Sequence, residues 1–263
     1  MDHLVLYALV ATLGTWAVTA LGSATVLIFR EPDRRVMNVL LGFASGVMIA
    51  ASFWSLLEPA ARRAEEAGTV PPYLVVTAGF VLGAVFIWAT DKAVTRARAA
   101  TGEKEKTPGR VIMLVLSITV HNIPEGLAVG VAFGALGRAG TPPEAVMGAV
   151  TVAVGIALQN FPEGAAVSVP LRREGYSRWK SFLVGQASGL VEPAAGVAGA
   201  ILVTGAERAL PFILSFAAGA MILVAVHELI PECQRNQSSN PYLATMGIVS
   251  GFALMMLLDV MLG

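Results

Sequence analysis

The sequence predicts an all-α membrane protein in which eight transmembrane helices form an inverted repeat of three, two and three helices. Three observations lead to this fold class. Apolar residues make up 56% of the 263 residues and charged residues only 14%, against about 25% charged residues in a soluble domain. The apolar residues are grouped into blocks of about 20 or more, the length that crosses a bilayer as a helix. Two short motifs in the first three blocks return in the last three.

Eight apolar blocks mark the predicted spans, and each is interpreted as a helix because a chain in lipid must pair its own backbone groups. They cover residues 4–29, 36–58, 72–90, 111–135, 144–170, 178–204, 210–231 and 241–262. The first block lacks a preceding basic stretch and a clear cleavage site, so we expect a span there and not a removed signal peptide. The longest connection, 91–110, carries charges of both signs and is expected to be a solvated, flexible cytoplasmic loop.

Lysine and arginine are unevenly distributed among the connections. The first, third, fifth and seventh connections hold 14 of the 18 basic residues. Because short basic loops stay in the cytoplasm, these odd connections are predicted to be cytoplasmic and both termini to be extracellular or periplasmic. The formal net charge is zero, so composition gives no indication of a nucleic-acid partner.

The second and seventh spans contain similar segments. Residues 41–49 (LGFASGVMI) and 214–222 (LSFAAGAMI) are identical at six of nine positions, at an offset of 173, and GFVL at 79–82 matches GFAL at 251–254 at an offset of 172. The second and seventh spans cross the membrane in opposite directions, so the repeat is inverted. Inverted repeats are typical of secondary transporters, whose substrate sites lie near the middle of the bilayer.

The fourth and fifth spans, between the two repeats, each carry polar residues and a proline in the same order. HNIPEG at 121–126 is followed by QNFPEG at 159–164. Residues four apart share a helix face, so His121 is expected beside Glu125, and Gln159 beside Glu163. The prolines, Pro124 and Pro162, are expected to kink each helix and to leave a backbone carbonyl without its usual partner.

The sixth span adds Glu192, so that three helices carry a carboxylate at mid-span. A charge at the centre of a bilayer costs at least about 2.5–3.5 kcal/mol, and no Lys or Arg lies near the centre of any span. A divalent cation or protons must therefore supply the positive charge. Imidazole, carboxylate and amide groups suit zinc and similar metals. The alternatives are that His121 is only a helix-packing hydrogen-bond donor and that the glutamates are protonated structural residues.

A second polar group, HELIPE at 227–232, resembles the start of a zinc-protease motif but has Pro231 where the second histidine should be. His227 and Glu228 are expected at the cytoplasmic end of the seventh span, with Asp91 on the same side, where they could guide a departing cation. The alternative is that these side chains simply reach for water. Met48, which matches Met221 in the repeat, is either a soft ligand or a packing residue.

Together these motifs resemble the ZIP (Zrt/Irt-like protein) metal transporters, and within them the bacterial GufA-like branch. The resemblance is carried by HNIPEG, QNFPEG, SGLVEP at 188–193 and HELIPE, and covers nearly the whole chain. It implies a multi-pass protein of the bacterial inner membrane, a homodimer, that moves divalent metal toward the cytoplasm by alternating access, one helix bundle sliding against another. Zn²⁺ is the expected cargo, and Cd²⁺, Fe²⁺, Mn²⁺ and Co²⁺ tolerate the same ligands.

The resemblance also implies two neighbouring metal sites. The primary site would use His121, Glu125, Gln159 and Glu163, with Met48 as a weaker ligand, and Ser55 would lie at the outer mouth. The second site would use Asn122 and Glu192 and share the other two glutamates. Relatives often carry a carboxylate where this chain has Asn160, between the two sites. Because Asn160 has no charge, we expect a weakly occupied second site or a single bound metal.

The sequence therefore favours a carrier of divalent cations and not an enzyme. An intramembrane metallohydrolase would use the same metal to activate water, but the chain has no complete protease motif and no nucleophile elbow. A metal-ion channel would differ only in rate and in the continuity of its pathway. The inverted repeat favours the carrier.

Overall fold

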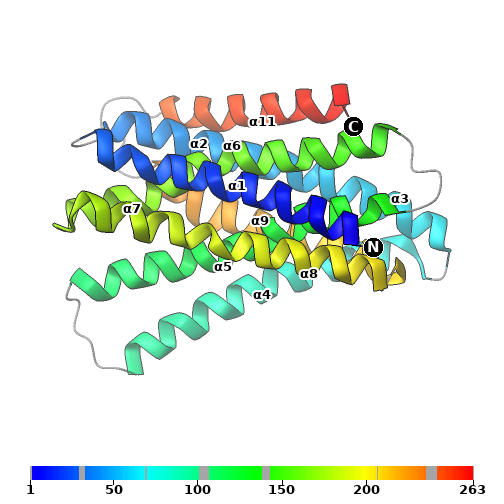
Figure 1. Cartoon of the computed structure of the whole chain (residues 1–263). Coiled ribbons are helices and arrows are strands. Elements are labelled where there is room, and N and C mark those ends of the chain that lie inside the picture. Colours follow the sequence, from blue (N-terminus) through cyan, green and yellow to red (C-terminus); the bar gives the residue numbers. More distant parts are fainter. Residues whose placement is uncertain are drawn as a thin grey trace.

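The long apolar segments fold into helices that run side by side along the length of the molecule in the computed structural model (Figure 1). The structure describes residues 2–29, 33–68, 70–100, 107–137, 143–205, 207–234 and 242–262. The regular elements within those ranges are helices throughout. Both termini lie at the same end of the bundle (Figure 1), as an even number of membrane crossings requires.

The α-helices are α1 (Asp2–Ile28), α2 (Arg34–Ala51), α3 (Glu58–Ala67), α4 (Pro72–Ala100), α5 (Thr107–Gly134), α6 (Pro143–Arg173), α7 (Arg178–Ala187), α8 (Val191–Gly205), α9 (Leu210–Val224), α10 (Ile230–Gln234) and α11 (Tyr242–Leu262). Short 3-10 turns occupy Ala135–Gly137, Ser188–Leu190 and Glu207–Ala209, and π-helical segments occupy Ser52–Leu57 and Ala225–Leu229. Seven helical stretches of the described chain are long and apolar enough to cross a membrane, and α5 coincides with the predicted fourth span. The eight predicted spans thus each correspond to a helix or a run of joined helices.

The connection between the third and fourth spans is shorter than predicted. Helix α4 continues to Ala100 and α5 begins at Thr107, so most of the expected loop 91–110 is helical, and residues 101–106 lie outside the described residues. The stretch that continues α4 is rich in alanine and arginine (AVTRARAA). Both residues favour helix strongly, and the charge of the arginines ends the span without ending the helix.

The main helix pairs follow the predicted inverted repeat. Helix α2 packs on α11 and α9 packs on α4, while α1 packs on α6 and α8 packs on α5. Spans one to three correspond to spans six to eight, and span four to span five. Under this exchange the α2–α11 pair becomes the α9–α4 pair, and the α1–α6 pair becomes the α8–α5 pair. The contacts therefore have the pseudo-twofold relation that the sequence repeat predicts.

The pairs assemble into two groups of helices. We call α1, α5, α6, α7 and α8 the site bundle, and α2, α4, α9 and α11 the frame bundle. Within each bundle the helices touch at glycines, where an added Cβ would collide with a backbone carbonyl of the next helix. Such contacts join Gly22 to Phe161 and Gly126 to Glu192 in the site bundle, and Gly46 to Ile248 and Gly219 to Phe80 in the frame bundle. Small residues permit this close approach in membrane helices.

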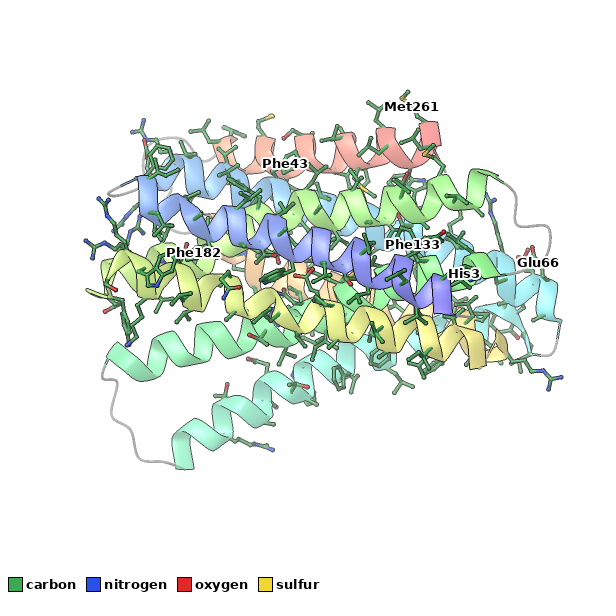
Figure 2. The ribbon with its side chains drawn as sticks, viewed as in Figure 1. His3, Phe43, Glu66, Phe133, Phe182 and Met261 are labelled. Carbon is green, nitrogen blue, oxygen red and sulfur yellow. The ribbon has the colours of Figure 1, made fainter. Side chains whose placement is uncertain are left out.

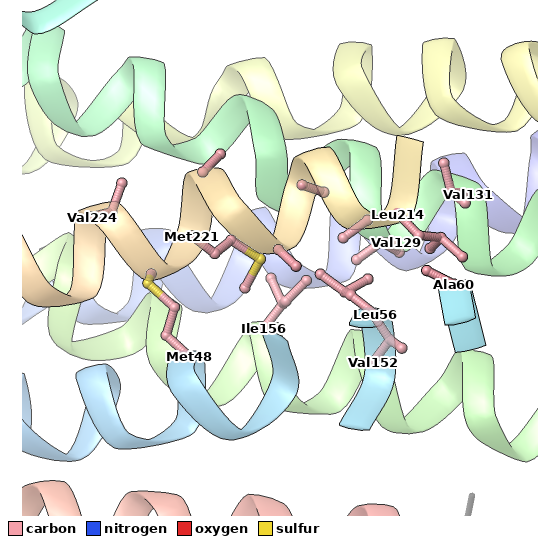
Figure 3. Packing of buried hydrophobic residues seen from close by; sticks show 14 of the residues in the cluster. Met48, Leu56, Ala60, Val129, Val131, Val152, Ile156, Leu214, Met221 and Val224 are labelled. Carbon is pink, nitrogen blue, oxygen red and sulfur yellow. The ribbon is translucent and has the colours of Figure 1, made fainter. Parts of the chain in front are cut away.

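Side chains, and not backbone, fill the space between the two bundles. The largest apolar cluster takes Met48, Leu214 and Met221 from the frame bundle and Val129 and Ile156 from the site bundle (Figure 3). Contacts between side chains can re-form after a small displacement more readily than a glycine held against a carbonyl. Close backbone contacts thus hold each bundle together, and side chains that can repack join the two bundles.

Among the described residues, the regular α-helix is interrupted at three places within the predicted spans. The π-helical segment Ser52–Leu57 in the second span and the segment Ala225–Leu229 in the seventh begin 173 residues apart, which is the offset of the sequence repeat. In the sixth span the 3-10 turn Ser188–Leu190 separates α7 from α8, and α8 begins one residue before Glu192. Discontinuous helices of this kind mark substrate sites in transporters.

The outer surface carries the apolar side chains that a lipid bilayer would cover. On α11, which is largely exposed, Met261 and Val260 are 70% and 71% exposed, and Met261 projects away from the bundle (Figure 2). Exposed tyrosine and tryptophan side chains, Tyr73 and Trp179, lie in the first turns of α4 and α7. This arrangement is typical of a helical membrane protein, with apolar side chains outside and the few polar ones inside.

Candidate metal-binding centre

The polar residues of the twin motifs come together inside the site bundle. Helices α5 and α6 continue through Pro124 and Pro162 and carry their motifs at the level where α8 begins. All the predicted mid-span ligands except Met48 are polar side chains exposed by 5% or less: His121, Asn122, Glu125, Gln159, Asn160, Glu163 and Glu192. The sequence-based grouping of these residues therefore corresponds to one buried polar centre in the structure.

Glu125 of α5 and Gln159 of α6 meet directly. The Gln159 amide Nε2 donates a hydrogen bond of 2.7 Å to Glu125 Oε1. The other carboxylate oxygen, Glu125 Oε2, is buried without a hydrogen-bond partner, and so are Gln159 Oε1 and Glu163 Oε1. Buried acceptors without partners are rare in folded proteins. We call these two carboxylates with Gln159 and His121 the primary pocket.

Glu192 lies in a different environment, which we call the Glu192 pocket. Asn160 Nδ2 donates to both of its carboxylate oxygens, at 2.9 Å and 2.8 Å. Thr15 of α1 donates to Oε2 at 2.6 Å, and Thr19 donates to Oε1 at 3.4 Å. Both oxygens of this carboxylate are therefore occupied by neutral donors.

Asn122 is engaged at the break in the sixth span. Its Nδ2 donates a 3.0 Å hydrogen bond to the backbone oxygen of Ser188, in the 3-10 turn before α8. A side chain from α5 thus bonds a backbone carbonyl at the helix break in the sixth span. The Oδ1 atoms of Asn122 and Asn160 are both buried without a partner.

The described residues do not present a ready cage of three His, Cys, Asp or Glu side chains for a metal ion. Two of the carboxylates instead face amides, since Gln159 donates to Glu125 and Asn160 donates to Glu192. A cation that enters must replace the Gln159 donor or use the three oxygens that have no partner. The donor types are those that zinc and other first-row metals accept.

His121 connects the centre to the frame bundle. Its Nε2 lies 3.1 Å from Glu228 Oε1, in the π-helical segment of the seventh span. Glu228 in turn helps to line a small pocket whose wall also includes Asp91, His227 and the apolar side chains Ile87, Trp88, Leu223 and Val224. The structure thus brings the three residues expected at the cytoplasmic end into one pocket next to His121.

Met48 and Ser55 both lie in the second span, in α2 and in the π-helical segment that follows it. Met48 is fully buried in the apolar cluster with Met221 and Ile156 (Figure 3). Ser55, in the other π-helical segment, donates a 2.7 Å hydrogen bond to Asp259 of α11. Sequence reasoning missed Asp259, although a carboxylate within the last span was a usable signal. It also missed Thr15 and Thr19, because a threonine in a span is cheap to bury when it bonds to its own helix.

Known proteins are similar in sequence to nearly the whole of this chain. A family model described as "ZIP Zinc transporter" matches residues 100–259. "Zinc transporter ZIP11" of Xenopus tropicalis is 39% identical over an alignment of 333 residues, and this alignment covers 98% of this chain and 98% of the relative's. "Zinc transporter ZIPB" of Bordetella bronchiseptica is 38% identical, over 98% of this chain and 82% of its own. "Zinc transporter GufA" of Myxococcus xanthus is 35% identical, over 97% and 98%.

Proposed function

The chain belongs to the ZIP zinc transporter family, and from this premise we propose that the primary pocket is the site that carries zinc across the membrane. The protein is a multi-pass membrane transporter of divalent metal and not an enzyme. The ligands of the cargo in this proposal are His121, Glu125, Gln159 and Glu163.

One observation carries the assignment of the ligands. Three buried oxygens in the primary pocket, on Glu125, Gln159 and Glu163, have no hydrogen-bond partner, and the two carboxylates lie close enough for their charges to interact. An unsatisfied buried acceptor costs about 1–3 kcal/mol. A divalent cation would satisfy all three oxygens and would offset the repulsion between the carboxylates. It would displace Glu228 from His121 Nε2, so cargo binding and the contact between the bundles would compete.

The direction of transport is inferred from the small pocket beside His121. Asp91, His227 and Glu228 line this pocket, at the ends of spans that the distribution of basic residues places toward the cytoplasm. We infer that this arrangement is the inward-facing state, in which cargo leaves past these three side chains. Met48 and Ser55 then belong to the outer pathway.

The two-bundle construction supports transport by sliding. Glycines hold the helices of each bundle backbone to backbone, whereas apolar side chains separate the bundles. The site bundle carries the twin motifs and Glu192, so it would move with the cargo while the frame bundle stays in place. This is the alternating access that the sequence predicts for the carrier.

We propose that a single zinc ion is carried at a time. Asn160 donates into both oxygens of Glu192, so its amide nitrogen occupies the face where a second cation would bind. With that position filled by a neutral donor, Asn122 and Glu192 make a poor second site. Cd²⁺, Fe²⁺, Mn²⁺ and Co²⁺ remain expected alternative cargoes, and the homodimer that the family resemblance implies remains a prediction.

Uptake of zinc into proteoliposomes tests the ligand assignment. His121→Ala and Glu163→Ala should abolish uptake, while Glu65→Ala, which removes an exposed carboxylate on α3, should transport like the wild type. Normal uptake by both pocket variants would overturn the assignment. Uptake by none of the proteins, including the wild type, would overturn the transport function itself.

A further inference from the structure

Helix α1 buries a row of hydroxyl groups against the polar centre. Thr12, Thr15, Thr19 and Ser23 are each exposed by 1% or less, in a helix that is otherwise mostly apolar. Their spacing of three or four residues places them on one face of the helix. Neither the twin motifs nor the transport pathway accounts for this row.

The four hydroxyls have different partners. Thr12 donates to its own helix, at the backbone oxygen of Ala8 (2.7 Å), and Ser23 donates to the backbone oxygen of Gly164 (3.0 Å). Thr15 and Thr19 also lie within reach of backbone oxygens of their own helix, at Thr12 (3.0 Å) and Thr15 (3.4 Å). Only these two hydroxyls contact a side chain of the centre, and both contact Glu192. The 2.6 Å distance from Thr15 Oγ1 to Glu192 Oε2 is in the range of a hydrogen bond to a charged acceptor, whereas the 3.4 Å contact of Thr19 is long.

Glu192 is supported by other helices because it lies next to a break in its own span. It lies in the first turn of α8, immediately after the 3-10 turn Ser188–Leu190 and before Pro193, so the adjoining turn does not fix it as firmly as a continuous helix would. Its side chain is instead held from α1 by Thr15 and from α6 by Asn160. Its charge also reaches the primary pocket, since it interacts with both Glu125 and Glu163.

We propose that Thr15 is a positioning residue of the zinc site, an inference that rests on the transport function proposed above. The Thr15 hydroxyl fixes the Glu192 carboxylate at a distance from which the charge of Glu192 attracts the cation in the primary pocket. Glu192 then acts as an anchored negative charge that stays in place while cargo binds and leaves. Thr19 adds a weaker restraint on the other oxygen.

The expected consequence is a change in affinity and not in the rate of movement. Removing a group that orients a charged residue at a metal site typically lowers metal affinity by about 10–100-fold. Thr15 contacts Glu192 and not the primary ligands, so the lower part of that range applies. Thr15→Val should raise KM for zinc about 10-fold and leave the maximal rate of uptake near that of the wild type.

The test is a set of variants in proteoliposomes with zinc as the probe. Thr15→Val keeps the shape of the side chain and removes its hydroxyl, and Thr15→Ser restores the hydroxyl. Thr12→Val is the matched control, since it removes a buried hydroxyl one turn away that bonds only to its own helix. We expect a raised KM for Thr15→Val alone, with Thr15→Ser and Thr12→Val close to the wild type.

A double-mutant cycle separates positioning from packing. If Thr15 acts through Glu192, Thr15→Val has no further effect on KM in a Glu192→Gln background. An equal rise in KM in both backgrounds, or no rise in the single variant while the wild type transports zinc, would overturn the proposal and leave the transport function intact. If Thr15→Val fails to fold, Thr15→Ala serves in the same cycle, and no uptake by the wild type would contradict the transport function instead.

Discussion

The two carboxylate pockets at the centre of the molecule lie side by side and differ in how their oxygens are satisfied. In the Glu192 pocket, Thr15, Thr19 and Asn160 donate to both carboxylate oxygens. In the primary pocket, Glu125 and Glu163 each keep one buried oxygen without a partner. The hydrogen bonds of the Glu192 pocket are thus complete, whereas the primary pocket lacks a positive charge.

This difference indicates what separates a cargo site from a supporting one. A cation that entered the Glu192 pocket would have to displace hydrogen bonds that are already made, so its net gain would be small. A cation that enters the primary pocket satisfies acceptors that otherwise destabilise the fold. Carboxylates of the same chemical type can therefore have different roles in one membrane bundle.

The sharpest contrast is expected between Glu125→Gln and Glu192→Gln. Loss of a group that supports a ligand costs about 10–100-fold in metal affinity, so loss of the ligand Glu125 should reduce zinc uptake by more than about 100-fold, and loss of Glu192 by about 10-fold. Initial rates in proteoliposomes over a range of zinc concentrations measure both effects. Equal losses in the two variants would mean that the pockets do not differ in function.

A second expected effect is a change in the number of bound metals. Asn160→Asp replaces the donor that faces Glu192 with a carboxylate and so converts the complete pocket into an unsatisfied one. The wild type should bind one zinc ion tightly and Asn160→Asp two, as measured by equilibrium titration of the metal-free protein in detergent. Two equally tight sites in the wild type would contradict the single-cargo proposal.

The backbone that carries Asn160 offers a test of stability. An added Cβ on Gly22 of α1 would collide with the carbonyl oxygen of Phe161, the residue after Asn160. Gly22→Ala should therefore destabilise the fold by about 1–3 kcal/mol, seen as a lower melting temperature in detergent. Gly14→Ala, on the same helix with nothing within 4 Å, is the control and should be neutral or slightly stabilising. Equal melting temperatures would show that α1 is not held tightly against α6.

The smallest effect is expected outside the two pockets. Asp91 lines the pocket next to His227 and Glu228 and is partly exposed, so its charge is worth up to about 1 kcal/mol. Asp91→Asn should slow zinc uptake by about two- to five-fold without a change in the number of zinc ions bound. Glu65→Gln is the matched control, and a loss as large as that of Glu125→Gln would make Asp91 a cargo ligand.

The sequence was sufficient to predict the helices, the inverted repeat and the residues of the buried polar centre. Charged residues stand out in an apolar chain, and the i, i+4 spacing of His121 and Glu125 fixes their common face. Hydroxyls do not stand out in this way, so the role of Thr15 emerges only from its 2.6 Å contact with Glu192. The contact between His121 and Glu228 joins residues 107 positions apart on different bundles, and spacing within one helix carries no information about it.

The two π-helical segments bear on the history of the chain. A π-turn contains one more residue than an α-turn and is rare in proteins, yet such segments begin at Ser52 and at Ala225, 173 residues apart, the offset at which the sequences repeat. Two independent one-residue insertions would have had to occur at corresponding positions in the two halves. One insertion in an ancestral three-helix unit, before its gene was duplicated, accounts for both. The halves differ at the matching positions Ser55 and Glu228, so the same irregularity presents a hydroxyl in one half and a carboxylate in the other.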